Sequence, residues 1–328
     1  MTAAEAPAGA RLVVTGAAGF LGARVMAAAR RAGFDALGVV RDCELGEAAT
    51  GDVIEVLDWT DEQARRRLFE RAAAAVIVHC AGHNGRFGGA PDAAVLQAAN
   101  VELTGALLDT VAALRSRPSA VGSHRAVGSG PAVVVLSSAS VYGLQPPVPT
   151  PEAAPLAPVG AYAASKLAAE EVCRAAASCG LHVVIGRPFN VIGPGEPPGS
   201  VTATLTSQAL LAPRGGQAAV RLRETVSVRD FVDADDVAEA LVALGCAGET
   251  GAAYNICSGR GVSVAELVRR ASTVWQREFD LSVAEPQAAG TVSIGDPAAL
   301  LALGWRARRT LDDSLAAIAA QAEGPVVP

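Results

Sequence analysis

The only lysine of the sequence follows a tyrosine by four residues. The two are Tyr162 and Lys166, in the segment AYAASK at residues 161–166, and the chain has only three tyrosines. The alanine and charge pattern of residues 159–177 predicts a helix, on which positions four apart share one face. A free phenol has a pKa of about 10, and an adjacent ammonium lowers it by favouring the phenolate. The pair therefore predicts a tyrosine that exchanges protons near neutral pH.

The use of lysine rather than arginine also indicates a binding role. Every other member of the 27 Lys+Arg residues is an arginine. A lysine ammonium is a compact three-donor group that can hydrogen bond a ribose hydroxyl, which a planar guanidinium does not copy. A Tyr-x-x-x-Lys pair can equally be an ordinary surface pair, so its meaning depends on the elements around it.

A serine at a strand end completes a candidate catalytic set. The apolar run AVVVLSS ends near Ser138, in LSSASVYG at residues 136–143. Ligands of α/β proteins bind at the carboxyl ends of parallel strands, so this hydroxyl can hold a substrate carbonyl against Tyr162. Serine-rich strand ends are also common turns. The order of strand, serine, loop and tyrosine–lysine helix favours the catalytic interpretation.

The elements that must position these residues alternate along the chain. The sequence has six apolar runs, with helical patterns between most of them. In chain order, the first covers residues 11–15, the second ends at Val40, the third begins at Val53, the fourth ends at Cys80, the fifth ends near Ser138 and the sixth ends at Pro188. Continuous apolar strands between helices predict a parallel sheet covered on both faces. The sequence thus predicts an α/β protein with a Rossmann-type doubly wound parallel sheet and a smaller C-terminal α/β substrate domain.

The pattern changes after residue 188, which suggests a division of the chain. Residues 193–200, GPGEPPGS, are expected to be a loop, followed by a helix through residue 211. The segment 221–244 is expected to return to the main sheet. We therefore expect an NAD(P)-binding domain from residues 1–188 plus about 221–250. The substrate-binding part is expected from 189–220 and 251–328.

A glycine-rich turn directly follows the first strand. In TGAAGFLG the glycines are Gly16, Gly19 and Gly22. Glycine permits a tight turn and a close approach of the backbone to a pyrophosphate. The helix that follows would offer the N–H groups of its first residues, Phe20 and Leu21, and the positive end of its dipole. The position of the turn predicts dinucleotide binding rather than a purely structural turn.

The residue after the second strand bears on which dinucleotide is bound. That strand ends VVRD, so Arg41 occupies the place where an acidic residue would bind the ribose of NAD. A guanidinium there suits a 2′-phosphate. The sequence therefore favours NADP(H), while the neighbouring Asp42 keeps NAD(H) open. An ordinary surface arginine is the alternative for Arg41.

Further cofactor contacts are expected at the ends of the third and fourth strands. Asp58 can receive the adenine amino group, with Trp59 beside it. Cys80, Ala81 and Gly82 end the fourth strand where a cofactor should pass.

Composition excludes several functional classes. The 328 residues are 51% hydrophobic, which argues against disorder, and the net charge of -6 with no basic stripe argues against nucleic-acid binding. No apolar run is long enough for a membrane span. None of the six cysteines forms a Cys-x-x-Cys pair, and no metal site is expected. The N-terminal segment lacks the features of a signal peptide, so a cytoplasmic location is expected.

Across nearly its whole length the chain resembles the extended short-chain dehydrogenase/reductases, the NAD(P)-dependent epimerase/dehydratase family. The motifs that carry this resemblance are TGAAGFLG, HCAG, SSASVYG, YAASK, RPFNVIGPG and RDFVD. The resemblance implies that Ser138, Tyr162 and Lys166 form a catalytic triad. RPFNVIGPG, RDFVDADDV, YNICSG and GDPAALLALGW are most similar to the GDP-4-keto-6-deoxymannose reductase branch, although 4-epimerases share many of these motifs.

The resemblance also assigns roles to residues that the pattern alone does not single out. Asn100, in NVELTG, matches an asparagine that helps to organise the site next to the cofactor, and Pro188 matches the segment that faces the nicotinamide. Asn190 and Arg229 match residues that contact the diphosphate of a nucleotide-sugar substrate. Dimerisation through the helices near 93–113 and 160–178 is a further expectation of the family.

The departures from the family pattern are informative. Sugar-nucleotide 4,6-dehydratases carry an Asp-Glu pair where this chain has Ala139 and Ser140, so dehydration by that route is not expected. Ala139, next to Ser138, is expected to contact the substrate. A second arginine that often clamps the diphosphate is absent from EPQAAGTVSIGD; Arg221 or Arg223 would have to compensate, or the substrate is less anionic than a nucleotide sugar.

The segment HNGRFGG after the fourth strand is unusual for the family. His83, Asn84 and Arg86 can line a substrate pocket there. A glycine-rich loop without a binding role is the alternative.

Together these patterns predict an NAD(P)-dependent oxidoreductase, namely an NADP(H)-dependent reductase of a 4-keto-deoxysugar nucleotide. The alternatives are an NAD-dependent nucleotide-sugar 4-epimerase and a ketoreductase of a non-nucleotide secondary metabolite. A non-catalytic NADP-binding sensor would not need a tuned phenol. The expected partners are a small-molecule substrate and a second copy of the chain, with no nucleic acid and no membrane.

Overall fold

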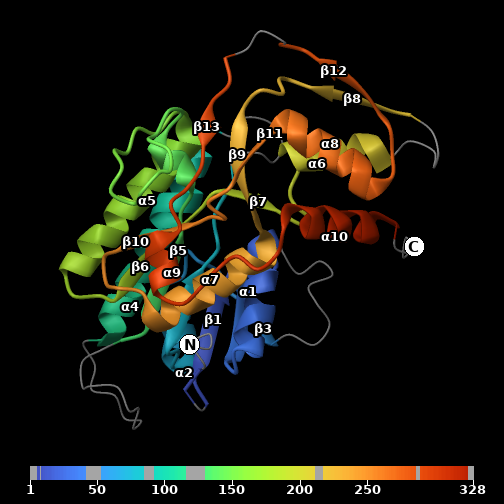
Figure 1. Ribbon diagram of the computed structural model, residues 1–328. Coiled ribbons are helices and arrows are strands. Elements are labelled where there is room, and N and C mark those ends of the chain that lie inside the picture. The colour runs from blue at the N-terminus through green and yellow to red at the C-terminus, as the bar shows by residue number, and fades with distance from the viewer. Residues whose placement is uncertain are drawn as a thin grey trace.

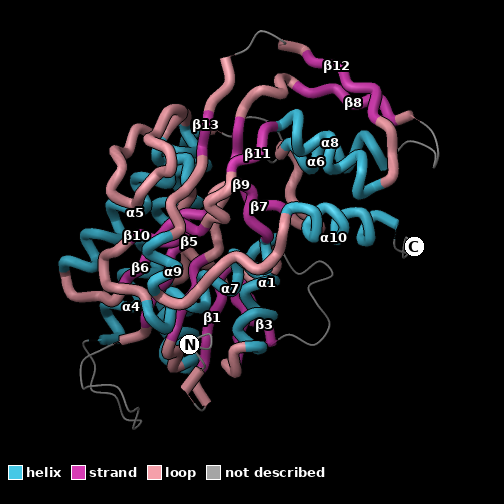
Figure 2. Tube along the Cα trace, in the orientation of Figure 1, coloured by secondary structure: helices cyan, strands magenta, loops and turns pink. Residues whose placement is uncertain are grey.

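The structure is a computed structural model, and it describes residues 6–7, 9–41, 53–84, 92–115, 130–210, 217–285 and 289–323. Two parts lie side by side (Figures 1 and 2). The larger part holds the N-terminal half of the chain, and the smaller part holds α6, α8 and α10 with several short strands. Among the described residues, none of the helices combines the length and apolarity that a membrane span requires.

Seven parallel strands form the large sheet, in the order β10-β6-β5-β4-β1-β2-β3. They are β1 (Arg11–Thr15), β2 (Asp35–Val40), β3 (Val53–Val56), β4 (Val76–His79), β5 (Ala132–Leu136), β6 (Val183–Pro188) and β10 (Ala253–Ile256). From β1 the chain adds β2 and then β3 on one side, and it then crosses to the other side of β1 to add β4, β5 and β6. This reversal of strand order marks the carboxyl ends of β1 and β4 as the place where ligands of such sheets bind.

Helices cover both faces of this sheet because alternate strand residues point to opposite sides. Leu12 and Val14 of β1 belong to a core with α1 (Phe20–Arg31) and α7 (Ala234–Ala247), and Val13 belongs to the opposite core. The helices over that second face are α2 (Glu62–Ala72), α4 (Leu103–Arg115) and α5 (Ala161–Ser178). The predicted doubly wound α/β fold is confirmed.

The smaller part has its own core and two small sheets. The core contains Leu205, Phe231, Leu267, Trp275 and Leu315. One sheet joins β7 (Asn190–Ile192), β9 (Val228–Asp233), β11 (Gly261–Ser263) and β13 (Val292–Ser293), and the other pairs β8 (Ala218–Leu222) with β12 (Phe279–Val283). The helices are α6 (Val201–Leu210), α8 (Val264–Trp275) and α10 (Leu311–Glu323), and the short α9 (Ala298–Ala302) packs near β10.

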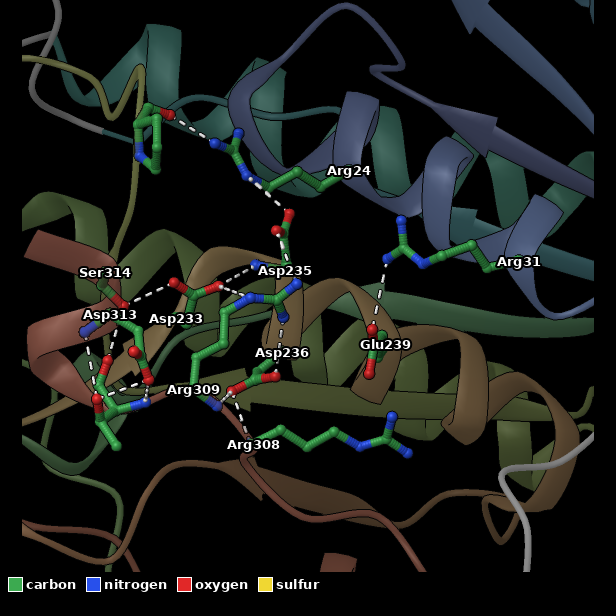
Figure 3. Close-up of polar contacts among 12 residues, drawn as sticks. Arg24, Arg31, Asp233, Asp235, Asp236, Glu239, Arg308, Arg309, Asp313 and Ser314 are labelled. Carbon is green, nitrogen blue, oxygen red and sulfur yellow. Dashed lines mark hydrogen bonds and ion pairs between the residues drawn. The ribbon is translucent and has the colours of Figure 1, made fainter. Parts of the chain in front are cut away.

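A cluster of arginine and aspartate side chains joins the two parts (Figure 3). Asp233 caps α7, and Asp235 and Asp236 lie in its first turn, where negative charge is favourable at the positive end of the helix dipole. Arg309, just before α10, lies 3.2 Å from Asp235 and from Asp236. Arg24 of α1 lies 3.3 Å from Asp235 and donates to the carbonyl of residue 194. The cofactor-side helix α1 is thus linked to the smaller part.

The course of the chain differs in one respect from the expected domain division. Of the segment 221–244, only α7 packs on the large sheet, whereas β9 joins β7, β11 and β13. The large sheet takes its seventh strand, β10, from residues that the sequence assigned to the substrate-binding part. Strand β10 is short, and its place in the sheet depends on pairing with β6, which the local sequence pattern does not encode.

Candidate active site

Helix α5 carries Tyr162 and Lys166 on one face. Gly160 starts it with a positive φ of 86°, which glycine adopts without strain. Lys166 is buried, with 8% of its surface exposed, and its Nζ donates to the carbonyl oxygen of Leu136 at 3.0 Å. Leu136 is the last residue of β5, two positions before Ser138. The lysine thus holds the helix against the strand end that carries the serine.

Burial lowers the pKa of Lys166 to about 8, because an ammonium loses solvation there. Interactions with Cys80, Cys173 and Glu170 oppose this shift. Burial raises the pKa of both thiols to about 12, so they carry no charge at neutral pH. Glu170 is therefore the anion among these three groups that favours the charged lysine.

Ser138 caps the short 3-10 helix η3 (Ala139–Tyr142), which follows β5. Its Oγ accepts a hydrogen bond from the N–H of Ser140 at 3.2 Å, which leaves the hydroxyl hydrogen for another acceptor. Ala139 is buried in a small core with Val141 and Phe189. The structure thus places Ser138 just after the strand end, as predicted, and buries Ala139 in this small core.

Asn100 lies in a π-helical segment, η2 (Gln97–Glu102), between α3 (Ala93–Leu96) and α4. Its amide oxygen accepts from the N–H of His83 at 2.9 Å, and its Nδ2 donates to the His83 carbonyl and to Ser165 Oγ, both at 3.0 Å. Asn100 is 1% exposed. These bonds fasten the loop after β4 to α5.

The glycine turn fits a dinucleotide pyrophosphate. A Cβ on Gly16 would lie 2.7 Å from the backbone nitrogen of Ala81, and one on Gly22 would lie 2.0 Å from the carbonyl oxygen of Gly16. These two glycines therefore allow β1, β4 and α1 to meet closely. Gly19 caps α1 without a side-chain hydrogen bond, and the first turn of α1 has no acidic residue. Its first N–H groups, at Phe20 and Leu21, lack intrahelical partners and suit an anion.

The end of β4 lies beside this turn. Cys80 donates its N–H to the carbonyl of Thr15, and Ala81 lies against Gly16. Gly82 has a φ of 157°, and a Cβ there would lie 2.6 Å from the amide oxygen of Asn100. Only a glycine fits between the loop and Asn100. The three residues predicted to line the cofactor path thus connect the glycine turn to Asn100 and, through it, to helix α5.

Arg41, Asp58 and Trp59 lie after strands β2 and β3. Arg41 is exposed directly after β2. Asp58 is exposed and accepts from the N–H and hydroxyl of Thr60, which lower the pKa of the Asp58 carboxyl. The Trp59 ring is buried against Phe69, so its side chain belongs to the core. Asp42, the alternative indicator for NAD(H), lies outside the described residues.

The predicted diphosphate contacts share one face of the small sheet. Asn190 pairs with Phe231 in the register of β7 and β9, and Arg229 lies two residues before Phe231 on the same side. Arg229 donates to the carbonyl and hydroxyl oxygens of Thr291, each at 2.7 Å. Thr291 belongs to the segment EPQAAGTVSIGD, which lacks the second diphosphate-binding arginine of the family. In this chain the segment instead accepts hydrogen bonds from Arg229.

The other candidates for the substrate site are more scattered. Arg223 is exposed and pairs with Glu285 at 3.2 Å, and Arg221 is exposed on β8. His83 and Asn84 are half-buried, His83 is hydrogen bonded to Asn100, and Arg86 lies outside the described residues. Pro188 is buried at the end of β6. Among the described residues, no group of three or more His, Cys, Asp or Glu side chains is arranged to hold a metal ion.

Two charged residues near this site escaped the sequence analysis. Glu170 and Arg187 form a buried ion pair at 2.7 Å. Two signals were available: Glu170 follows Lys166 by four residues, and Arg187 interrupts the apolar strand HVVIGRP. A charge inside an apolar strand requires a buried partner.

Comparison with known proteins agrees with this geometry. A sequence model of the NAD dependent epimerase/dehydratase family matches residues 12–257, which is most of the chain. The chain belongs to this family. Membership confirms the predicted family and the predicted enzyme class, an NAD(P)-dependent oxidoreductase.

Individual members of the epimerase/dehydratase family match over different lengths. The chain is 34% identical over 211 residues to GDP-6-deoxy-D-mannose reductase of Pseudomonas aeruginosa, covering 62% of this chain and 69% of that protein. It is 29% identical over 343 residues to dTDP-6-deoxy-L-talose 4-dehydrogenase (NAD(P)(+)) of Kitasatospora kifunensis, with 97% of both chains covered. The structure of RMD from Pseudomonas aeruginosa complexed with NADPH superposes with a TM-score of 0.75 at 29% identity, covering 96% and 99% of the two chains.

Proposed function

We propose that this protein is an NADP(H)-dependent reductase that acts on the ketone of a 4-keto-deoxysugar nucleotide. The observation that supports the proposal is the contact of Lys166 with the end of β5, which holds the helix of Tyr162 against the strand end that precedes Ser138. Three of the similar proteins support the proposal: GDP-6-deoxy-D-mannose reductase, dTDP-6-deoxy-L-talose 4-dehydrogenase and the NADPH-bound RMD structure.

Each catalytic side chain has a separate task in this proposal. Bound NADPH would supply the hydride to the carbonyl carbon. Tyr162 donates a proton to the oxygen that becomes a hydroxyl, and Ser138 donates a hydrogen bond that orients this oxygen. Lys166 stabilises the phenolate that Tyr162 leaves behind and holds the cofactor ribose.

Two features favour reduction over the other reactions of the family. Ala139 occupies the sequence position of a dehydratase acid, directly after Ser138, so no carboxyl group is available there to remove water from a sugar. Arg41 is exposed at the end of β2, where a guanidinium favours a 2′-phosphate and therefore an exchangeable NADP(H). We assign Asn190 and Arg229 to the diphosphate of the substrate, because they share a face of the small sheet.

The first experiment measures the cofactor that the purified protein retains and its Kd for NADPH and NADH. GDP-4-keto-6-deoxymannose and dTDP-4-keto-6-deoxyglucose are then supplied with NADPH, and its oxidation is followed, with Tyr162→Phe as the control. Tighter binding of NADPH than of NADH and Tyr162-dependent oxidation are expected. Tightly retained NAD with interconversion of sugar epimers would instead identify a 4-epimerase, and oxidation only with a simple ketone would exclude a nucleotide sugar.

A further inference from the structure

A buried ion pair lies one helical turn beyond Lys166. The Nε of Arg187 lies 2.9 Å from Oε1 of Glu170, and its Nη2 lies 2.7 Å from Oε2. The two side chains are 2% and 1% exposed. A fork-like contact of this kind fixes orientation as well as distance. Burying both charges is costly, and hydrophobic residues of similar volume often stabilise a core equally well. Stability alone therefore does not account for the pair.

The glutamate side of the pair reaches the serine strand. The hydroxyl of Ser137 donates to Oε1 of Glu170 at 2.6 Å. Ser137 immediately precedes Ser138, and Glu170 lies four residues after Lys166 on the same helix. The carboxylate therefore joins the helix of Tyr162 and Lys166 to the strand end of Ser138, in addition to the contact that Lys166 itself makes with Leu136.

The arginine of the pair contacts the 3-10 helix η3 and, through it, strand β10. Arg187 immediately precedes Pro188, and its Nη1 donates to the Tyr142 hydroxyl at 2.7 Å. Tyr142 ends the 3-10 helix that Ser138 caps, and it donates to Oδ1 of Asn255 at 2.7 Å. Asn255 pairs with Arg187 in the register of β10 and β6. The pair thus contacts the end of β5 through Ser137 and the 3-10 helix through Tyr142, and Tyr142 extends the network to β10.

We propose that Glu170 and Arg187 are positioning residues, which act with Ser137 to set the helix face of Tyr162 and Lys166 against the strand end of Ser138. This inference rests on the proposed function, since it concerns the alignment of the same three side chains. Neither charged residue needs to touch substrate. Their effect reaches the reaction through the distance between the phenol, the ammonium and the serine hydroxyl, on which proton transfer depends.

The test uses Ser137→Ala, because removing Glu170 would leave Arg187 buried without a counter-charge and would endanger folding. Ser314→Ala is the matched control. The hydroxyl of Ser314 also donates at 2.6 Å to a buried carboxylate, that of Asp233, and Ser314 is 1% exposed (Figure 3). Both variants lose one hydrogen bond of the same kind, but only Ser137 adjoins the catalytic segments.

The first readout is reduction of the two keto-sugar nucleotides with NADPH. We expect Ser137→Ala to lower kcat about 10-fold, equivalent to about 1.4 kcal/mol in the barrier, with the Kd for NADPH changed by less than about twofold. Ser314→Ala should lose a similar amount of thermal stability and keep kcat. Equal kcat in the two variants of an active enzyme would overturn the positioning role and leave the proposed function standing.

The second readout needs no substrate. The tyrosinate absorbance of the full chain is titrated, and the signal that Tyr162→Phe removes is assigned to Tyr162. Lys166 interacts with His79 and Cys80 from the end of β4 and with Cys173 and Glu170 from its own helix. None of these residues is substituted in Ser137→Ala, and only Glu170 loses a hydrogen bond there.

We expect the Tyr162 midpoint to rise in Ser137→Ala and to stay constant in Ser314→Ala, because a displaced ammonium stabilises the phenolate less. If the wild type reduces neither keto-sugar nucleotide, the proposed function fails. A raised midpoint would still support the positioning role, and an unchanged one would overturn it.

Discussion

The Nζ of Lys166 lies 3.0 Å from the carbonyl oxygen of Leu136, across the interface between α5 and the end of β5. The contact gives the ammonium a fixed place at the carboxyl end of β5, where the charge is buried. The burial of Lys166 supports its proposed role of stabilising the Tyr162 phenolate, because a partly desolvated ammonium interacts more strongly with a neighbouring phenolate.

The buried lysine should make the stability of the protein depend on pH in a defined window. The pKa of Lys166 is about 8 in the folded state, against 10.5 as the ordinary value. Between these values the unfolded chain binds more protons, so the free energy of unfolding should rise with pH. Relative to Lys166→Met, the wild type should gain about 3 kcal/mol across this window. Urea unfolding of both proteins at several pH values measures the difference, and a constant difference would contradict the burial of a charged lysine.

The glycine turn should tolerate no side chain at residue 22. A Cβ there would lie 2.0 Å from the Gly16 carbonyl oxygen, so Gly22→Ala must displace the turn from α1. We expect a loss of about 1–3 kcal/mol in stability and a large rise in the Kd for NADPH. Gly105→Ala, within helix α4, is the control, since its Cβ would lie 4.0 Å from the side chain of Val172 on α5. That change should stabilise the protein by about 0.5–1 kcal/mol, and similar effects at both sites would refute the close packing of the turn.

Arg229 should govern the affinity for an anionic substrate. Its substitution by alanine removes a charged donor from the face that it shares with Asn190, which should raise KM for a nucleotide sugar about 10- to 100-fold. The KM for a simple uncharged ketone should not change. Arg269→Ala on α8, an exposed arginine that pairs with Glu266, serves as the control. An equal effect of Arg229→Ala on both substrates would point to a structural role through Thr291.

The Glu170–Arg187 pair should show strong energetic coupling. Arg187→Met leaves a buried carboxylate without its main counter-charge, so it should cost about 3–5 kcal/mol of stability. Glu170→Leu should cost a similar amount, and the double variant should cost clearly less than the sum. Denaturant unfolding of the four proteins gives the coupling energy directly. Strict additivity would show that the two charges are compensated by other groups.

The sequence predicted those parts of the fold and the site that depend on local patterns. The strand–glycine–helix unit around Gly16 and the spacing of Tyr162 and Lys166 both encode their geometry within a few residues. The large parallel sheet followed from its apolar runs, and the structure confirms it.

Contacts between distant segments were not predictable in the same way. The bond between Arg229 and Thr291 joins residues 62 positions apart, and the network from Ser137 to Asn255 joins four separate segments. Trp59 was expected beside Asp58 as a cofactor contact, and the structure shows that its ring is buried. Such placements depend on the tertiary packing of α2 and β4 against the ring, on which the local pattern is silent.

The late entry of β10 into the large sheet has a consequence for synthesis of the chain. When residues up to 188 have left the ribosome, β6 has β5 on one side, but its other neighbour, residues 253–256, has not yet been made. An apolar strand with unpaired backbone groups is a site of aggregation. The nascent dinucleotide-binding half must therefore wait, or be protected, until about 65 further residues emerge, which at ordinary rates of synthesis is a delay of several seconds.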